Sequence, residues 1–234
     1  MKLKALSLAL GLGAMTLVSC NQNGNKDVAL NNQIDSVSYA IGINFGTNLK
    51  KSNITEFNEA AILAGIYDVI DEDSLKIELR ESGSVINTYM RDLQAKVGEE
   101  NIAKGEKFLS ENAKKEGVVT TASGLQYRVI SEGTGEKPAA TDQVKVHYRG
   151  TTIDGKEFDS SYKTNKPATF AANRVIKGWT EALQLMPVGS KYELFIPAKL
   201  AYGPRGAGGA IGPNETLIFE VELLEIVTPA EPKK

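Results

Sequence analysis

The chain has one histidine, His147, and one cysteine, Cys20, the two residue types most often used for nucleophilic catalysis or zinc binding. Two such residues are too few for a zinc site made only of histidine and cysteine ligands. Catalysis by a cysteine–histidine pair would require these two residues to meet in the fold. His147 lies in the segment VKVHYRGTTIDGKEF, residues 144–158, which begins with the apolar–polar alternation of a β-strand.

This alternation separates His147 from the residue that follows it. Val144, Val146 and Tyr148 share one face of the expected strand, and that face is the buried one because it is apolar. His147 lies on the other face between two basic residues, and no acidic residue beside it in the sequence can orient its ring. We therefore expect His147 to be a structural residue and Tyr148 to line a cavity.

Cys20 ends a segment of a different kind. Residues 1–19 start with two nearby lysines and continue as an interrupted apolar run with small residues, which is typical of a signal peptide and short for a membrane span. Leu17-Val18-Ser19-Cys20 resembles a bacterial lipobox, in which the cysteine becomes the first mature residue and carries lipid. The alternative is an ordinary signal peptide with an incidental cysteine. We expect a lipid on Cys20, a membrane tether of residues 20–34, and a place in the envelope of a Gram-negative-type bacterium, periplasmic or at the outer membrane.

The overall composition narrows the possible functions. The 234 residues are 41% hydrophobic, which suits one or two soluble domains with a real core. The formal net charge is −2, so no basic field favours nucleic acid. We expect no metal and no cofactor.

Residues 35–117 are expected to be helical. Apolar residues at spacings of three and four predict a first helix from Asp35 or Ser36, either of which could cap it, and a second helix after Asn53. A third, long helix is expected to begin between residues 74 and 84 and to continue toward Lys115. Helices of this kind bury little surface alone, so they either dimerise through residues 35–97 or form a small self-contained bundle packed on the rest of the chain.

The end of the long helix has a different composition. Residues 101–116 are dense in lysine and glutamate, which predicts a solvated helix that takes no part in a core. Gly98 and Gly105 would each cost about 1 kcal/mol relative to alanine, so they predict a bend or a local weakness.

Residues 118–228 are expected to form an α+β domain. Residues 126–130, 144–148, 191–196 and 217–227 are rich in β-branched or aromatic residues, and Asp154-Gly155 predicts a hairpin. Residues 178–186 predict one short helix, whose Trp179 and Leu183 face an antiparallel sheet wrapped around it. The whole chain is thus expected to have an N-terminal helical region with a long stalk helix, this domain, and a disordered tail at 229–234.

Five blocks of this half occur in an order found in one family: VKVHYRG (144–150), GKEFDSS (155–161), VIKGW (175–179), AYG (201–203) and LIFEVEL (217–223). Together they resemble the FKBP-type peptidyl-prolyl cis-trans isomerases over about residues 120–227. Residues 35–117 more loosely resemble the helical dimerisation region and stalk of the Mip/FkpA-like cell-envelope members of that family. This resemblance favours a homodimer over a self-contained bundle.

The resemblance also implies a site. Tyr148, Asp159 and Tyr202 match the residues that act on the substrate, with Asp159 at the mouth of a pocket and the Tyr202 hydroxyl bonding a substrate carbonyl. Trp179 matches the floor on which the substrate proline ring rests. The other positions that match the family pocket are Phe158, Phe170, Val175, Ile176, Ile211 and Phe219. Ala168 stands where many members have an aromatic residue, which predicts that one wall is smaller.

These residue types suit rotation of an X–Pro bond. The barrier, about 18–20 kcal/mol, comes from amide resonance, and the twisted transition state is less polar than the planar amide. A dry aromatic pocket with one or two hydrogen bonds favours the twisted form. The expected partners are proline-containing unfolded or partly folded polypeptides. A chaperone whose helices clamp unfolded chains is the alternative.

The glycine-rich loop 203–214 is not followed by Gly-Lys-Ser/Thr, so it is not expected to bind phosphate. We expect this loop to be a mobile flap over the pocket.

Overall fold

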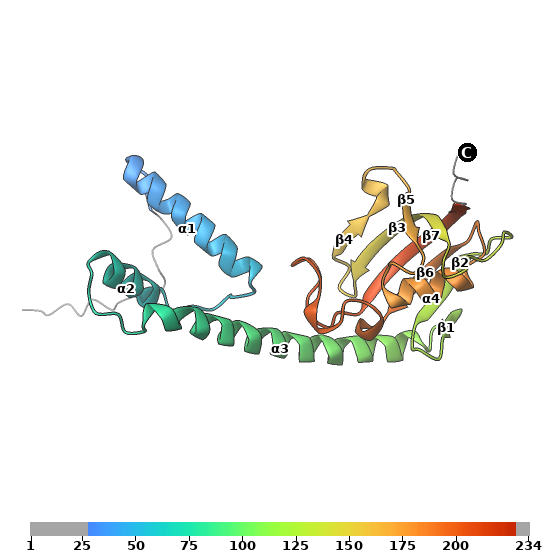
Figure 1. Ribbon diagram of the computed structural model, residues 1–234, viewed down its shortest axis with the longest axis horizontal. Coiled ribbons are helices and arrows are strands. Elements are labelled where there is room, and N and C mark those ends of the chain that lie inside the picture. Colours follow the sequence, from blue (N-terminus) through green and yellow to red (C-terminus); the bar gives the residue numbers. More distant parts are fainter. Residues whose placement is uncertain (1–27, 228–234) are drawn as a thin grey trace, which may run out of the picture. The chain divides into compact units, whose positions relative to one another are not determined.

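The computed structural model describes residues 28–227 (Figure 1). The expected signal peptide, Cys20, most of the tether at 20–34 and the tail at 229–234 lie outside the described residues. The described residues divide into two units, with the boundary between Asn48 and Leu49. No helix in the described part is long and apolar enough to cross a membrane.

Three helices make up the N-terminal half: α1 (Gln33–Lys51), α2 (Glu59–Ile70) and α3 (Leu79–Asn112). The Asn32 side chain accepts a hydrogen bond from the Asp35 backbone N–H at 2.9 Å. The cap of α1 is therefore Asn32 and neither of the two predicted residues, and the helix begins earlier than expected. Asn58 caps α2 in the same way, through the backbone N–H of Ala61.

Neither α1 nor α2 buries any of its residues. Large hydrophobic side chains are exposed along both helices and along the first turns of α3, among them Val37, Ile41, Phe45, Leu63, Tyr67, Val85 and Tyr89. Isolated helices of 12 to 19 residues are marginally stable in water. The apolar surface of this region therefore still needs a partner.

The C-terminal half contains an antiparallel sheet in the strand order β1-β2-β6-β7-β3-β4, with β5 paired to β3. The strands are β1 (Val118–Thr120), β2 (Gln126–Ser131), β3 (Gln143–Thr152), β4 (Glu157–Ser160), β5 (Ala168–Ala171), β6 (Lys191–Ile196) and β7 (Leu217–Val227). Short 3-10 helices lie at Ser161–Lys163, Ala198–Leu200 and Gly203–Arg205. The α+β prediction is confirmed, and β6 and β7 have the predicted bounds.

One helix, α4 (Lys177–Leu185), packs on the sheet and completes the core (Figure 1). Trp179 is 4% exposed and Leu183 is 1% exposed, which confirms that this face of the helix is buried. Val144 and Val146 on β3 are fully buried, as the alternation predicted. Gly155 turns the chain from β3 to β4 with a φ of +81°, which glycine adopts without strain.

The C-terminal half of α3 differs from the prediction of a solvated helix. Gly98, Gly105 and Asn112 are buried against the α+β domain. The Asn112 side chain donates to Gln126 Oε1 at 3.0 Å, and the Gln126 side chain donates to the Leu109 carbonyl at 2.9 Å. The helix continues through both glycines, which let it approach its neighbour closely.

Candidate active site

A cavity of about 640 Å³ lies in the α+β domain. It brings together the ten residues that the sequence assigned to a site: Tyr148, Phe158, Asp159, Phe170, Val175, Ile176, Trp179, Tyr202, Ile211 and Phe219. Its lining also includes four residues that were not predicted, namely Arg174, Ala207, Gly208 and Ala210. Three of them, Ala207, Gly208 and Ala210, lie in the glycine-rich loop 203–214 that was expected to be a flap, and Arg174 directly precedes the VIKGW block. Ala168 and His147 are not part of the lining.

The indole of Trp179 forms the floor of the cavity and the centre of a cluster of aromatic rings. Three rings meet it nearly edge-on: Tyr148 at 5.3 Å, Phe170 at 5.8 Å and Phe219 at 5.3 Å between ring centroids. Edge-to-face pairs of this kind each contribute about 0.5–1.5 kcal/mol beyond their burial. Trp179 Nε1 is buried without a hydrogen-bond partner among the described residues. The floor is thus rigid and apolar, with one unsatisfied donor.

A second ring pair forms a wall beside this floor. Phe158 on β4 meets Phe219 on β7 edge-on at 5.4 Å. Between these strands Gly150 of β3 is buried, and a Cβ placed on it would come within 2.6 Å of the Phe158 ring and 2.7 Å of the Phe219 ring. Only a residue without a side chain lets both rings stand where they are.

Two tyrosines and a carboxylate supply the polar groups. The Tyr148 hydroxyl donates to Asp159 Oδ2 at 2.6 Å, and the Ser160 backbone N–H donates to Asp159 Oδ1 at 2.8 Å. Burial, and then the hydrogen bond to Asp159, raise the pKa of Tyr148 well above its usual value. Burial, and then the Asp159 charge, raise the pKa of Tyr202. Both hydroxyls therefore keep their protons at neutral pH. Tyr202 is a partly exposed residue of the cavity lining, and its hydroxyl hydrogen is available for a ligand.

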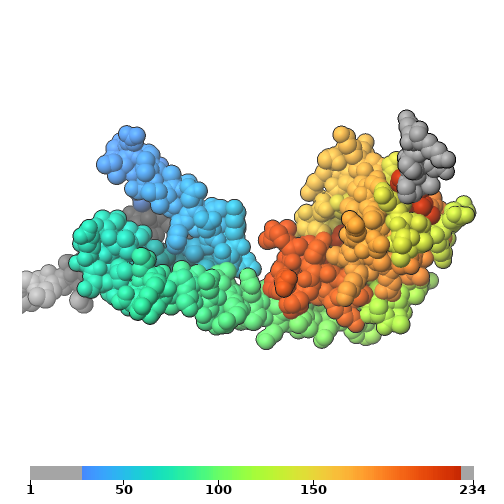
Figure 2. All heavy atoms as spheres, in the orientation of Figure 1, coloured from blue at the N-terminus to red at the C-terminus, as the bar shows by residue number. Residues whose placement is uncertain are grey.

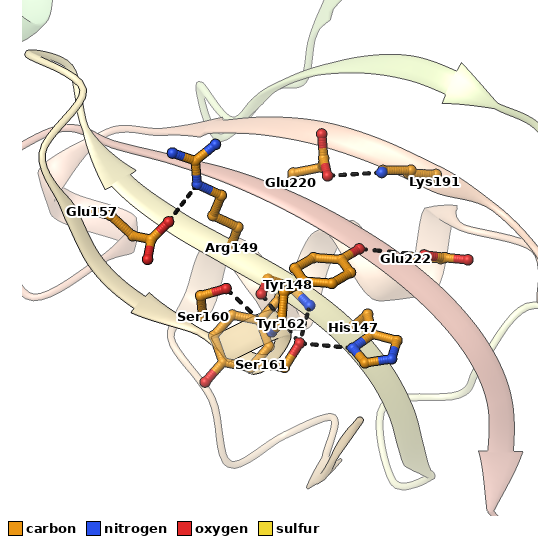
Figure 3. Close-up of polar contacts among 10 residues, drawn as sticks. All are labelled: His147, Tyr148, Arg149, Glu157, Ser160, Ser161, Tyr162, Lys191, Glu220 and Glu222. Atoms are coloured by element: carbon orange, nitrogen blue, oxygen red, sulfur yellow. Dashed lines mark hydrogen bonds and ion pairs between the residues drawn. The ribbon is translucent and has the colours of Figure 1, made fainter. Parts of the chain in front are cut away.

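His147 and Ser161 hold the strand behind Tyr148, as Figure 3 shows. The buried Ser161 Oγ accepts the Tyr148 backbone N–H at 2.8 Å and lies 3.0 Å from His147 Nδ1 and 3.2 Å from the Tyr148 carbonyl. The His147 ring stacks on Tyr162 at 4.8 Å. Ser161 belongs to the GKEFDSS block, but the sequence predicted no role for it. Ser161 thereby fixes the backbone of Tyr148, whose hydroxyl donates to Asp159.

Ion pairs cover the outer face of the sheet around this histidine (Figure 3). Glu157 pairs with Arg149 and with Lys163, and Lys191 pairs with Glu220 at 2.7 Å. The side chains of these groups are all partly exposed to solvent, so each pair contributes little to stability. They do not reach the cavity, which keeps the charged face and the apolar site on opposite sides of β3.

The loop of residues 203–214, here called the flap, closes one side of the cavity. Ala207 and Ile211 exchange two backbone hydrogen bonds of 2.9 and 3.0 Å, and the Asn214 N–H donates to the Gly203 carbonyl at 2.8 Å. Gly206, Gly208 and Gly209 have positive φ values. Ile211 is 6% exposed and faces the cavity, so the flap contributes an apolar lid.

Comparison with known proteins identifies the family. The family described as FKBP-type peptidyl-prolyl cis-trans isomerase matches residues 134–224, and the domain described as amino terminal to it matches residues 34–129. Outer membrane protein MIP of Legionella longbeachae is 44% identical over 234 residues, which cover 97% of this chain and 98% of that protein. This chain belongs to the FKBP-type peptidyl-prolyl cis-trans isomerases.

Two further FKBP relatives support the assignment. The FKBP-type 22 kDa peptidyl-prolyl cis-trans isomerase of Escherichia coli is 48% identical over 197 residues, or 81% of this chain and 94% of that protein. The crystal structure of FkpA from Escherichia coli matches with a TM-score of 0.66 and 36% identity, over 85% of this chain and 98% of that one. The predicted FKBP fold and isomerase activity are therefore confirmed.

Proposed function

We propose that the cavity on Trp179 is where this isomerase holds the proline ring of its substrate, and that residues 118–228 are the isomerase domain. The observation that carries the proposal is the Trp179 floor, which three rings surround edge-on beneath an open cavity. A pyrrolidine ring is apolar and flat enough to lie on an indole. Phe158, Phe170, Val175, Ile176, Ile211 and Phe219 supply the walls that keep water from the ring.

The catalytic effect follows from the polarity of the two amide states. The planar X–Pro amide is polarised by resonance, and the twisted transition state has lost that resonance. Transfer into a dry aromatic cavity disfavours the planar amide more than the twisted one, so the barrier falls. The walls hold the ring while the rest of the chain turns. No bond is made or broken by a side chain in this mechanism.

Three polar residues complete the proposed site. The Tyr202 hydroxyl donates to a carbonyl of the substrate and fixes its orientation, because it is the half-exposed donor at the cavity. Asp159 lies at the mouth and offers a carboxylate to the substrate backbone. Tyr148 holds that carboxylate in place at 2.6 Å and contributes its ring to the wall.

Substitution of the polar groups tests the site. We expect Tyr202→Phe to lower kcat/KM for a peptide with one X–Pro bond about two- to tenfold, the effect of one lost hydrogen bond. We expect Asp159→Leu to lower it about ten- to a hundredfold, because a charged acceptor contributes more. The cis-to-trans rate of the peptide measures both. Tyr162→Phe is the matched control, since it also loses one hydroxyl but lies outside the cavity. A wild-type rate equal to that of buffer would contradict the proposal.

Residues 35–117 are proposed to be a dimerisation region and stalk, with the contact between two copies made through residues 35–97. The exposed apolar side chains of α1 and α2, which bury none of their own residues, support a second copy of the chain as their partner. The same surface makes a chaperone role the second candidate, with the helices binding unfolded polypeptides that then reach the isomerase site. The exposed apolar side chains of the helices support both roles, and sedimentation and aggregation suppression measure the two separately.

Cys20 is proposed to carry lipid and to anchor the protein in the envelope of a Gram-negative bacterium. The lipobox-like Leu17-Val18-Ser19-Cys20 supports this, as does a relative named outer membrane protein. We expect the wild type to fractionate with membranes and Cys20→Ser to move to the soluble fraction. Mass spectrometry of the mature protein should show diacylglycerol and a fatty acid on Cys20. A wild type without lipid, cleaved elsewhere, would contradict the anchor.

A further inference from the structure

One face of α3 is built to approach the isomerase domain closely. Its members follow each other at spacings of three and four residues: Gly98, Asn101, Gly105, Phe108 and Asn112. Such residues lie on one side of a helix. Phe108 and Asn112 pack on strands of the sheet, with the Phe108 ring 6.0 Å from Phe195 and the Asn112 amide bonded to Gln126. This part of the face anchors the helix to the sheet.

The other part of the same face meets the flap. Asn101 Nδ2 donates to the Pro213 carbonyl at 2.8 Å. A Cβ on Gly98 would lie 3.0 Å from the Asn214 amide. Figure 1 shows the C-terminal half of α3 passing beneath this loop, and in Figure 2 the orange-red spheres near residue 210 rest against the green spheres of the helix. The base of the flap therefore stands on α3.

The contact just beyond the flap is the tightest one. A Cβ on Gly105 would lie 2.3 Å from Thr216 Oγ1 and 3.2 Å from Thr216 Cβ, so a side chain there requires Thr216, just before β7, to move. In the helix interior a glycine is less favourable than alanine by about 1 kcal/mol. The close approach of the helix to residues 213–216 explains why a glycine stands at position 105, which helix formation alone does not explain.

These contacts lie next to the lid of the cavity. Ile211, which faces the cavity, comes two residues before Pro213, and its N–H and carbonyl pair with Ala207. Within the flap the backbone hydrogen bonds are the Ala207–Ile211 pair and two bonds to the Gly203 carbonyl, from Gly206 and Asn214. With so few internal bonds, an outside support at Pro213 limits how the flap moves.

We propose that α3 is a platform for the flap, with Asn101 and Gly105 as positioning residues that keep Ile211 and Ala207 over the proline site. The inference rests on the proposed function of the cavity. Asn101 touches neither the cavity lining nor a ligand, so it acts through the flap. The stalk helix is on this account part of the catalytic domain, and any change in its docking changes substrate binding.

The test compares two glycine-to-alanine changes in the same helix of the full chain. We expect Gly105→Ala to displace the flap, and Gly83→Ala to leave it in place because a Cβ at Gly83 meets open space. Hydrogen exchange at the Ala207 and Ile211 amides should become on the order of tenfold faster in Gly105→Ala. KM for an X–Pro peptide should rise about two- to tenfold in Asn101→Ala, with kcat changed less. Thr216→Ala should restore slow exchange in Gly105→Ala, since it removes the atom at 2.3 Å.

The exchange measurement separates the two proposals. Unchanged exchange at Ala207 and Ile211 in both Gly105→Ala and Asn101→Ala would overturn the platform, whatever the activity. So would faster exchange with an unchanged KM in an active enzyme. An inactive wild type would instead contradict the proline site. In that case titration with the same peptide, followed by the fluorescence of Trp179, the one tryptophan in the chain, would still show whether flap release weakens binding.

Discussion

Trp179→Ala is expected to lower the free energy of unfolding by about 3–5 kcal/mol, the range for truncating a buried aromatic residue. The indole is 4% exposed and meets Tyr148, Phe170 and Phe219 edge-on, so the change removes the centre of the cluster. Activity should be lost as well, because the proline ring no longer has a floor. Urea unfolding followed by circular dichroism measures the first effect, and the cis-to-trans rate of an X–Pro peptide measures the second.

A matched control separates the two effects. Tyr127 stacks on Tyr192 at 5.5 Å, outside the cavity, and Tyr127→Ala also truncates an aromatic side chain packed on the core. We expect it to lose stability while its folded molecules keep the wild-type rate. Trp179→Phe supplies a variant that retains an apolar ring and folds. Folded Trp179→Ala protein with activity within twofold of the wild type would show that the indole is not the floor of the site.

Ile41→Glu is expected to convert a dimer into a monomer. Ile41 is 64% exposed on α1, so in a lone chain the change costs almost nothing. In a dimer it would bury a charge without a partner, which costs about 3–5 kcal/mol and raises the dissociation constant at least about a hundredfold. Sedimentation of the lipid-free Cys20→Ser protein should give the mass of two chains, and with Ile41→Glu added the mass of one.

The control for this change lies on the sheet. Ile130 of β2 is 47% exposed, and Ile130→Glu introduces the same charge outside residues 35–97. It should leave the dimer intact. A wild type that sediments as one chain would contradict the dimer. Loss of aggregation suppression in Ile41→Glu, with the wild-type rate on a short peptide retained, would support the chaperone role of the helices.

The sequence predicted the strands whose hydrophobic pattern is long enough to recognise. β6 and β7 are continuous runs of β-branched and aromatic residues, and their bounds were predicted correctly. β1, β4 and β5 have only three or four residues, too few for alternation to appear, and they were missed. The cap of α1 was misplaced because Asn32, Asp35 and Ser36 are all suitable caps. Only the structure shows that Asn32 accepts an N–H of the first helical turn, whereas Asp35 accepts the N–H of Asn31 before the helix.

The residues of the site could be predicted from the sequence, whereas the docking of α3 on the isomerase domain could not. Aromatic residues in family order mark the cavity, and the structure places all of them in its lining. The face of α3 consists largely of glycine and asparagine, which composition alone interprets as weak or solvated helix. Gly105 reveals its role only when Thr216 is seen 2.3 Å from where its Cβ would be. Close approach between segments far apart in the sequence has no local signal.

Gly150 supports two walls of the cavity from behind, although it is not itself part of the lining. Phe158 and Phe219 close over the α-carbon of this residue, and neither ring leaves room for a methyl group. Gly150 is paired through its backbone in the middle of the sheet, so the strand cannot shift to make room for a side chain there. The positions of two wall rings are therefore set by a residue that no ligand touches, and any side chain added at Gly150 would reshape the cavity from behind by displacing both rings.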